Sequence, residues 1–372
     1  MFLGHGLLAL AGAAGVAALV SYGRERALAL GLCAGAFALA PDVDILYAPV
    51  GLAEAASSGG DPVAGFWRGS NRIHRAVTHS LLLGSVVSLA VGCWAWALRD
   101  RRRPGTTAAT TISAVTDSVA SALAAITALS LLGDSIALTG IESGLLGAVV
   151  MIAFGATSLA IATLAAHWGL TAREIALIAL FGLWSHPFGD LFTGEPPAFL
   201  YPLDITLLAE RIAIHSDPTL HLLGAFAIEL GTFWAAALVY ASLSDSGLRA
   251  SVDWPAVLGV GYAGAVLALP APTLDSAYRF VLSVLGLGIA LGVVSELRSW
   301  ARSVGSSPRS ERATTQGGRS ITTAPGRALD ACRRATPGDP FGVALTGLTA
   351  VTLALGAYAL TYVATAATIP PI

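Results

Sequence analysis

The stretch HRAVTHSLLLGSVVSLAVGCWAWAL, residues 74–98, joins two histidines and an arginine to a long apolar run. Residues 80–98 carry no charged side chain, and about 20 such residues are enough for a helix to cross a bilayer. The whole chain of 372 residues is similar in character, with 55% hydrophobic and only 12% charged residues, against roughly 25% charged in a soluble domain. The sequence therefore predicts an integral membrane protein.

Helices satisfy their own backbone hydrogen bonds in lipid, so the predicted fold class is all-α: a polytopic transmembrane helical bundle of about ten helices. The ten apolar segments run approximately over 6–21, 27–40, 80–98, 112–132, 145–166, 172–186, 219–242, 255–271, 278–296 and 341–366. The second and sixth are short, so we expect each to be tilted or partly buried in protein.

Most of the arginines fall in one set of alternating loops. Short basic loops are retained in the cytoplasm, so this set is expected to be cytoplasmic and both termini to lie outside. No basic residue precedes the first segment and no clear cleavage site follows it, so we expect it to remain as a helix.

The chain is expected to have four parts. Residues 1–205 form a membrane core, 206–296 additional transmembrane helices, 297–339 an Arg-rich and disordered cytoplasmic linker, and 340–372 a C-terminal transmembrane helix.

Four polar clusters interrupt the apolar pattern: GHG at 4–6, PDVD at 41–44, HRAVTHS at 74–80 and SHPFGDLFTGEPPAFLYPL at 185–203. An even number of predicted crossings separates each cluster from the next, so all four are expected at the outer face. Imidazoles and carboxylates near a bilayer are costly unless they are paired, hydrated or bound to metal. Their collection on one face predicts a functional site.

Taken singly, the clusters also fit simpler interpretations. His5 fits an exposed terminus, and PDVD fits a helix stop followed by an Asx turn. His186 and Asp190 are four residues apart and share one helix face if the helix continues through Pro187, as it can when Pro187 falls in a first turn; a plain His–Asp hydrogen bond would also explain them.

The third cluster is more specific. If Thr78 or a neighbour caps the third helix, His79 lies in its first turn and His74 in the approaching loop. The five-residue spacing of these histidines is not that of a helical metal pair, so the loop would have to bring them together.

Together the clusters supply four imidazoles and three carboxylates, predicted as metal ligands: His5, Asp42, Asp44, His74, His79, His186 and Asp190. Seven donors exceed one tetrahedral shell, so the sequence predicts either two ions, or one ion with the other groups acting as orienting residues or a general base. Mixed nitrogen and oxygen donors fit a divalent ion, zinc first, with manganese and iron as alternatives. The scattered Cys33, Cys93 and Cys332 indicate no cysteine-type zinc site.

A metal-bound water with its pKa lowered toward about 7 suits hydrolysis of phosphate or acyl esters. Asp44, His79 and Arg75 are the predicted catalytic residues. Arg75 and Arg72 either neutralise a substrate phosphate or pair with Asp42 or Asp44.

At these residues the sequence resembles the membrane-bound, metal-dependent hydrolase family of the YdjM type. Its members carry Gly-His, Pro-Asp-x-Asp, His-Arg-x-x-Thr-His-Ser and Ser-His-x-x-x-Asp in this order, and the motifs begin here at Gly4, Pro41, His74 and Ser185. The resemblance covers roughly 1–205 and departs from the family at 193–203, where Thr-Pro followed by Gly is common. It implies a hydrolase with a metal site.

The leading hypothesis is thus a hydrolase acting on a phospholipid or another lipid-linked ester at the outer membrane face. Membrane lipids or a lipid-linked substrate are the expected partners, and no nucleic acid is expected. The alternatives are a non-catalytic scaffold with a structural metal, or a metal-ion or proton transporter. The acidic residues available to a transporter are Asp117, Asp134, Glu142 and Glu229, which form no evident path.

Five further polar residues are not assigned to the site. Four of them fit a polar interfacial loop and the fifth a cytoplasmic position: Asp204, His215, Asp217, His221 and, on the cytoplasmic side, His167.

Overall fold

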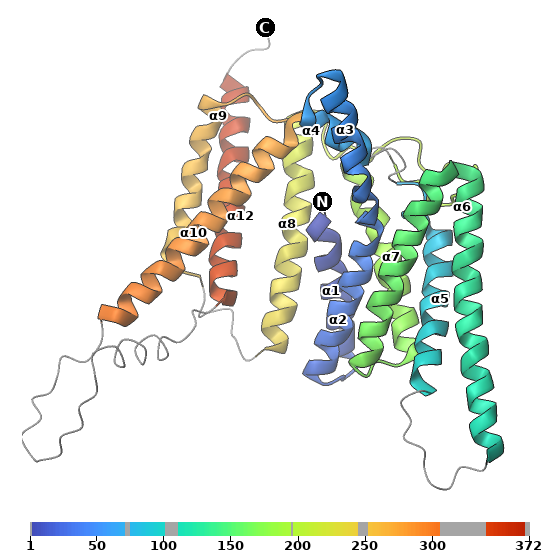
Figure 1. The fold of residues 1–372 in the computed structure, drawn as a ribbon. Helices are drawn as coiled ribbons and strands as arrows, with labels where there is room; N and C mark the ends of the chain where they lie inside the picture. Colours follow the sequence, from blue (N-terminus) through green and yellow to red (C-terminus); the bar gives the residue numbers. More distant parts are fainter. Residues whose placement is uncertain are drawn as a thin grey trace, which may run out of the picture. The chain divides into compact units, whose positions relative to one another are not determined.

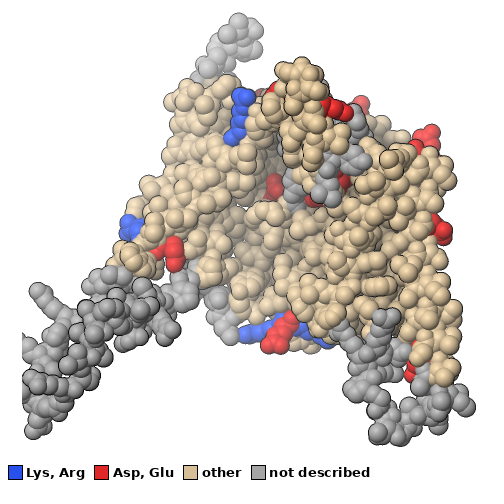
Figure 2. Space-filling view, in the orientation of Figure 1, with Lys and Arg blue, Asp and Glu red and all other residues tan. Residues whose placement is uncertain are grey.

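The computed structural model describes residues 2–70, 75–100, 111–194, 196–244, 252–305 and 340–368. Every regular element in these residues is a helix, which confirms the all-α prediction (Figure 1). Seven helices in this part of the chain are long and apolar enough to cross a membrane. Charged side chains are sparse on the face drawn in Figure 2, as a lipid-embedded surface requires. The protein is therefore a multi-pass membrane protein.

The chain divides into two compact units, described separately below. Unit 1 comprises Met1–Ile214 with Gly231–Asp245, and unit 2 comprises His215–Leu230 with Ser246–Ile372. Helix α8 (Pro218–Leu243) contributes its first half to unit 2 and its second half to unit 1.

Three helices form the centre of unit 1: α1 (Phe2–Leu19), α2 (Arg24–Leu39) and α7 (Ala172–Gly189). They approach closely at glycines, as small residues allow in membrane helices. A Cβ added to Gly35 would lie 2.8 Å from the Gly6 carbonyl oxygen, and one added to Gly182 would lie 2.5 Å from that of Ala34. This packing places the start of α1 beside the ends of α2 and α7.

The long element α6 (Thr111–His167) is a hairpin of two arms. Gly144 has φ 68°, a conformation that favours glycine, and the helix direction reverses there. A Cβ on Gly155 in the second arm would lie 3.4 Å from Leu132 in the first, so the arms run side by side (Figure 1). The arms correspond to the two segments expected at 112–132 and 145–166. A single helix of this length would be about 86 Å long, far more than a bilayer core requires.

Helix α5 (Leu81–Asp100) packs against this hairpin, and the Trp94 indole nitrogen donates to Thr163 Oγ1 at 2.9 Å. Between α2 and α5 the chain forms three elements that the apolar pattern did not predict: the 3₁₀ helix η1 (Ala40–Tyr47) and the short helices α3 (Ala48–Ser58) and α4 (Pro62–Ser70). The 3₁₀ helix begins one residue before Pro41, whose missing N–H cannot continue the α-helical ladder.

Unit 2 contains η4 (Trp254–Gly264), α9 (Ala265–Ala268), η5 (Leu274–Ser276), α10 (Ala277–Gly305) and α12 (Pro340–Thr368). The expectation of a regular α-helix over 255–271 is wrong, because most of that segment is 3₁₀, and Trp254–Ala268 is an apolar helix shorter than the seven above. Its Gly259 packs so closely on α12 that an added Cβ would meet the Ala350 carbonyl. Helix α10 extends to Gly305, so the first residues of the expected linker are helical, while 306–339 lie outside the described residues.

Candidate metal centre

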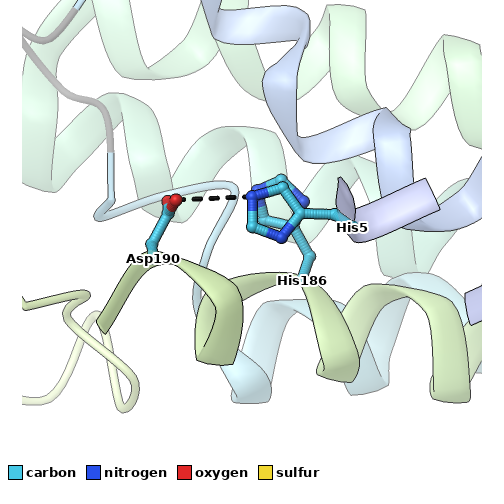
Figure 3. Close-up of side chains that lie close together, drawn as sticks. All are labelled: His5, His186 and Asp190. Atoms are coloured by element: carbon cyan, nitrogen blue, oxygen red, sulfur yellow. Dashed lines mark ion pairs between the residues drawn. The ribbon is translucent and has the colours of Figure 1, made fainter. Parts of the chain in front are cut away.

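The structure brings together side chains from all four polar clusters. His5 comes from α1, Asp42 from η1, His79 from the residues just before α5, and His186 and Asp190 from the end of α7. Figure 3 shows three of them, His5, His186 and Asp190, with their polar atoms facing one another. The predicted convergence of distant helix ends is therefore present. His74 lies outside the described residues.

His186 and Asp190 face the site from the same side of α7, as their spacing predicted. The helix continues through Pro187 to Gly189, and Asp190 begins the 3₁₀ turn η2 (Asp190–Phe192). Pro187 stands in the last turn of α7, so its expected place in a first turn is wrong. The helix persists although proline cannot donate to the carbonyl four residues earlier.

His5 is already helical, because α1 begins at Phe2, and its side chain is buried instead of lying at an exposed terminus. Its Nε2 atom lies 3.3 Å from Asp190 Oδ1, and its ring centroid lies 4.2 Å from that of His186. Gly189 makes this approach feasible: a Cβ there would collide with the His5 ring.

His79 precedes its helix, so its expected position in a first helical turn is wrong. The cap of α5 is Ser80, whose Oγ accepts from the Leu83 N–H at 3.2 Å and donates to the Tyr201 carbonyl at 2.6 Å. Ser80 is a neighbour of Thr78, so the cap lies where it was expected, and Thr78 itself contacts the neighbouring imidazole.

The Thr78 hydroxyl determines which nitrogen of His79 carries the proton. Its Oγ1 lies 3.1 Å from Asp44 Oδ2 and 2.9 Å from His79 Nδ1. Since its single proton is donated to the carboxylate, the oxygen accepts from an Nδ1–H of His79. The lone pair of His79 is therefore on Nε2.

His186 has the same tautomer for a separate reason. Its Nδ1 lies 2.6 Å from the Ala38 carbonyl oxygen, which can only accept, so Nδ1 carries the proton. The lone pair on His186 Nε2 faces His79 Nε2 at a distance of 2.9 Å. Both imidazoles are fully buried.

Two carboxylates complete this group of atoms. Asp190 Oδ2 lies 3.1 Å from His79 Nε2, and Asp42 Oδ1 lies 3.5 Å from His186 Nε2. When both imidazoles are neutral and both carboxylates are ionised, these four atoms are all acceptors, an arrangement that a bound cation stabilises. Among the described residues, the buried Asp42 Oδ2 has no hydrogen-bond partner either.

The donor set fits a bound divalent ion. A tetrahedral shell with zinc–nitrogen distances of 2.0–2.1 Å has edges of about 3.3 Å between donor atoms, within the range of the separations above. The donors form two groups that share one histidine, with ligand atoms within 4.8 Å in each: Asp42, His79 and His186, and His5, His186 and Asp190. The number of bound ions, one or two, stays a prediction. So do the identity of the metal and the role of each ligand.

Asp44 was predicted as a ligand, but it belongs to neither donor group. Its buried carboxylate accepts from Thr78, so it acts on the site through that hydroxyl and the His79 ring. Carboxylates that orient metal-ligating histidines in this way are common around metal sites.

Arg75 contacts Asp190, a partner that the sequence did not predict. Its Nε lies 3.6 Å from Asp190 Oδ2, and its Nη1 donates to the Asp190 carbonyl at 3.5 Å. Its backbone φ of 68° is unusual for a residue other than glycine and directs the chain around the site. Arg72 lies outside the described residues.

The residues left unassigned by the sequence belong to neither donor group. His167 is exposed at the end of the second arm of α6, where its Nδ1 bonds the Thr163 carbonyl. Asp204 is exposed in the loop after α7, and His215, Asp217 and His221 belong to unit 2.

Sequence reasoning missed three contributors to the site: Thr78, the Ala38 carbonyl and Gly189. Thr78 stood inside a quoted motif and could have been found as a polar neighbour of a ligand. A backbone carbonyl and a glycine that makes room for a ring leave no comparable signal.

Residues 1–146 match the model of a family described as YdjM inner membrane protein. This match confirms the suspected resemblance for the part that contains His5, Asp42 and His79. It ends before His186 and Asp190, so it is shorter than the expected 1–205. No curated protein and no solved structure matches the chain.

Proposed function

We propose that this multi-pass membrane protein, similar to YdjM inner membrane proteins over residues 1–146, is a metal-dependent hydrolase of lipid-linked esters. One observation carries the metal part of the proposal: the Nε2 lone pairs of His79 and His186 face each other at 2.9 Å. Two independent hydrogen bonds hold these tautomers, and two carboxylates approach the same point. Buried sites with this donor set are typical of zinc and related ions.

A bound divalent ion supplies a water nucleophile at neutral pH and stabilises charge on an ester oxygen. The side chains of this protein would hold and orient the reacting groups. Arg75 is suited to contact a phosphate oxygen, because its guanidinium lies beside Asp190 and is not fully buried. Asp44 has a positioning role through Thr78 instead of the direct catalytic role suggested by the sequence.

The proposed substrate class follows from the location of the donors. His79 lies just before α5, and His186 and Asp190 lie at the end of α7; both helices are long and apolar enough to span a bilayer. A site at this level meets ester and phosphodiester groups of lipids without extracting the acyl chains from the membrane. Phosphodiester and carboxyl-ester lipids are therefore the first substrates to test.

The experiment measures metal content and hydrolysis on the same purified protein. Wild type, Asp42→Asn, His79→Gln and His167→Gln proteins are loaded with zinc or manganese, dialysed, and assayed with a chromogenic phosphodiester and with lipid vesicles, with and without chelator. Asp42→Asn and His79→Gln should lose both metal and activity, whereas His167→Gln, an exposed histidine outside the site, should retain both.

Three results would count against the proposal, each in a different way. If the wild type binds no metal, the proposed metal centre is wrong. If it binds metal but hydrolyses no ester, the proposed hydrolase activity is wrong and the metal centre stands. Metal-dependent ion flux in liposomes, lost in His79→Gln, favours the transporter instead.

We further propose that the site faces outward, since most arginines lie in the loops expected inside. Cysteines at Ser57 in α3 and at Asp204 after α7 should react with a membrane-impermeant maleimide on intact cells. A cysteine at Arg24, at the start of α2, should react only after permeabilisation. The opposite pattern would invert the orientation.

A further inference from the structure

The first arm of α6 has a face that no other element of unit 1 covers. Its exposed residues recur every three or four positions, as on one side of a helix: Leu123, Ile126, Ser130, Gly133, Asp134 and Ala137. A Cβ added to Gly133 would have no heavy atom within 4 Å. The middle of this face therefore combines two small residues with a hydroxyl and a carboxyl group.

Asp134 lies deep within the apolar part of the hairpin. It is ten residues from the Gly144 reversal, or about 15 Å along the axis of an arm, which is about half the thickness of a bilayer core. The packing of Leu132 beside Gly155 places Asp134 near the level of Ile152 in the second arm.

A carboxyl group facing lipid at this depth is costly, so ionisable groups in membrane helices nearly always have a partner. Within the described residues, Asp134 makes no hydrogen bond or ion pair, while its exposed neighbours leave room for another helix. The second arm packs against the buried residues of this arm, where Leu132 lies beside Gly155.

We infer that this face packs against the same face of a second copy of the chain, forming a two-fold dimer in the membrane. The face supplies both a donor and an acceptor, as a self-complementary interface requires. Helical side chains lean toward the helix N-terminus, so the Asp134 carboxyl reaches the level of Ser130 of the partner subunit when the helices cross near Gly133. This dimer does not depend on the hydrolase proposal.

Disulfide cross-linking in native membranes tests the dimer. In a background in which Cys33, Cys93 and Cys332 are replaced by alanine or serine, Gly133→Cys should give an oxidised species of twice the chain mass. Ile152→Cys is the matched control, because Ile152 is equally exposed and lies at the same depth on the other arm. It should remain monomeric.

A second set of variants tests the polar contact without cysteine. Asp134→Asn keeps the hydrogen-bonding geometry and should dimerise like wild type in lipid nanodiscs. Asp134→Leu and Gly133→Leu should weaken the dimer about tenfold, because they remove the interhelical hydrogen bond or the close approach. Helical circular dichroism and the elution of the detergent-solubilised protein, measured in parallel, should not change and so report that the variants fold.

The inference is overturned if Gly133→Cys cross-links no more than Ile152→Cys, or if it cross-links to a different protein. A Gly133 cysteine that neither cross-links nor reacts with a lipid-soluble maleimide would mean that the rest of the same chain covers the face. That result also excludes the dimer.

Discussion

The Nε2 atoms of His79 and His186 lie 2.9 Å apart although 107 positions separate the two residues in the chain. In the neutral imidazoles neither Nε2 atom carries a proton, because the Thr78 hydroxyl and the Ala38 carbonyl each accept from the Nδ1 atom of the same ring. Two lone pairs at this distance repel unless a cation lies between them and the nearby carboxylates. The first prediction therefore concerns the group that holds the first of these tautomers.

Replacing Thr78 by valine should weaken metal binding about 10- to 100-fold, the range found when an orienting partner of a ligand is lost. Valine keeps the shape of the side chain but cannot accept from His79 Nδ1 or donate to Asp44. Competition with a metal-buffering chelator measures the affinity. Thr78→Ser keeps the hydroxyl and should bind like wild type, and equal affinity in the valine protein would argue against an orienting role.

Replacing Gly189 by alanine should displace His5 from Asp190, because the new Cβ would occupy the position of the imidazole ring. If His5 completes the donor group that it forms with His186 and Asp190, metal content should fall. The control is Gly15→Ala on the same helix as His5, where a Cβ makes an ordinary contact at 3.7 Å. Full metal content in Gly189→Ala would exclude His5 as a ligand.

The ion pair between Arg26 and Glu174 should contribute to stability but not to metal binding. The guanidinium makes bonds of 2.8 and 2.7 Å to the two carboxylate oxygens, near the start of α2 and of α7 and away from the donor atoms. Arg26→Ala should lower the unfolding free energy by at most about 1 kcal/mol, since the pair is partly exposed. Thermal unfolding and metal titration together check this. A large loss of metal affinity in Arg26→Ala would contradict the conclusion that this ion pair does not contribute to metal binding.

The cap of α8 should make unit 2 less stable in acid. Asp217 Oδ1 accepts from the Leu220 backbone N–H at 2.8 Å, and Oδ2 accepts from the Tyr362 hydroxyl at 3.1 Å. The Leu220 bond, followed by the Tyr362 bond, lowers the pKa of Asp217 below its ordinary value of 3.8. A lowered folded-state pKa means that this stabilisation is complete above the unfolded-state pKa and is lost as the pH falls through the folded value.

The measurement for this cap is thermal unfolding from pH 7 to pH 3. Asp217→Ala should be less stable than wild type at pH 7, by about 1 kcal/mol for a lost cap, and the difference should shrink toward pH 3. Asp217→Asn retains an acceptor oxygen that does not titrate, so this protein should lose less stability than wild type between pH 7 and pH 3. If the Asp217→Ala protein were less stable than wild type by the same amount at pH 7 and at pH 3, the predicted titration of Asp217 would be refuted.

The convergence of the polar clusters was predictable because helix ends alternate between two faces of a membrane. Counting crossings placed His5, Asp42, His79 and His186 at one face without any knowledge of packing. The ligand roles of Asp42 and Asp44 could not be separated in this way. Both follow Pro41 within three residues, and only the path of η1 directs one carboxylate to His186 and the other to Thr78.

Local backbone geometry could not be predicted where the composition is the same for a 3₁₀ helix and an α-helix, or for a straight helix and a hairpin. The segment 255–271 is as apolar as a spanning α-helix, but close packing at Gly259 accompanies a 3₁₀ helix. The segment 112–166 was correctly divided into two arms, yet the reversal at Gly144 depends on one positive φ angle that many glycines could adopt. Whether a glycine marks a reversal or a close helix contact depends on the residues packed around it, which the sequence does not show.

The central claim is that His79 and His186 bind the same divalent ion. X-ray absorption spectroscopy of the zinc-loaded protein tests it most directly, since it reports the ligands of the metal itself. The account predicts nitrogen and oxygen ligands at about 2.0–2.1 Å with the signature of at least two imidazoles, reduced in His79→Gln. A protein that retains no zinc, a sulfur shell at about 2.3 Å, or a spectrum unchanged in His79→Gln would contradict it.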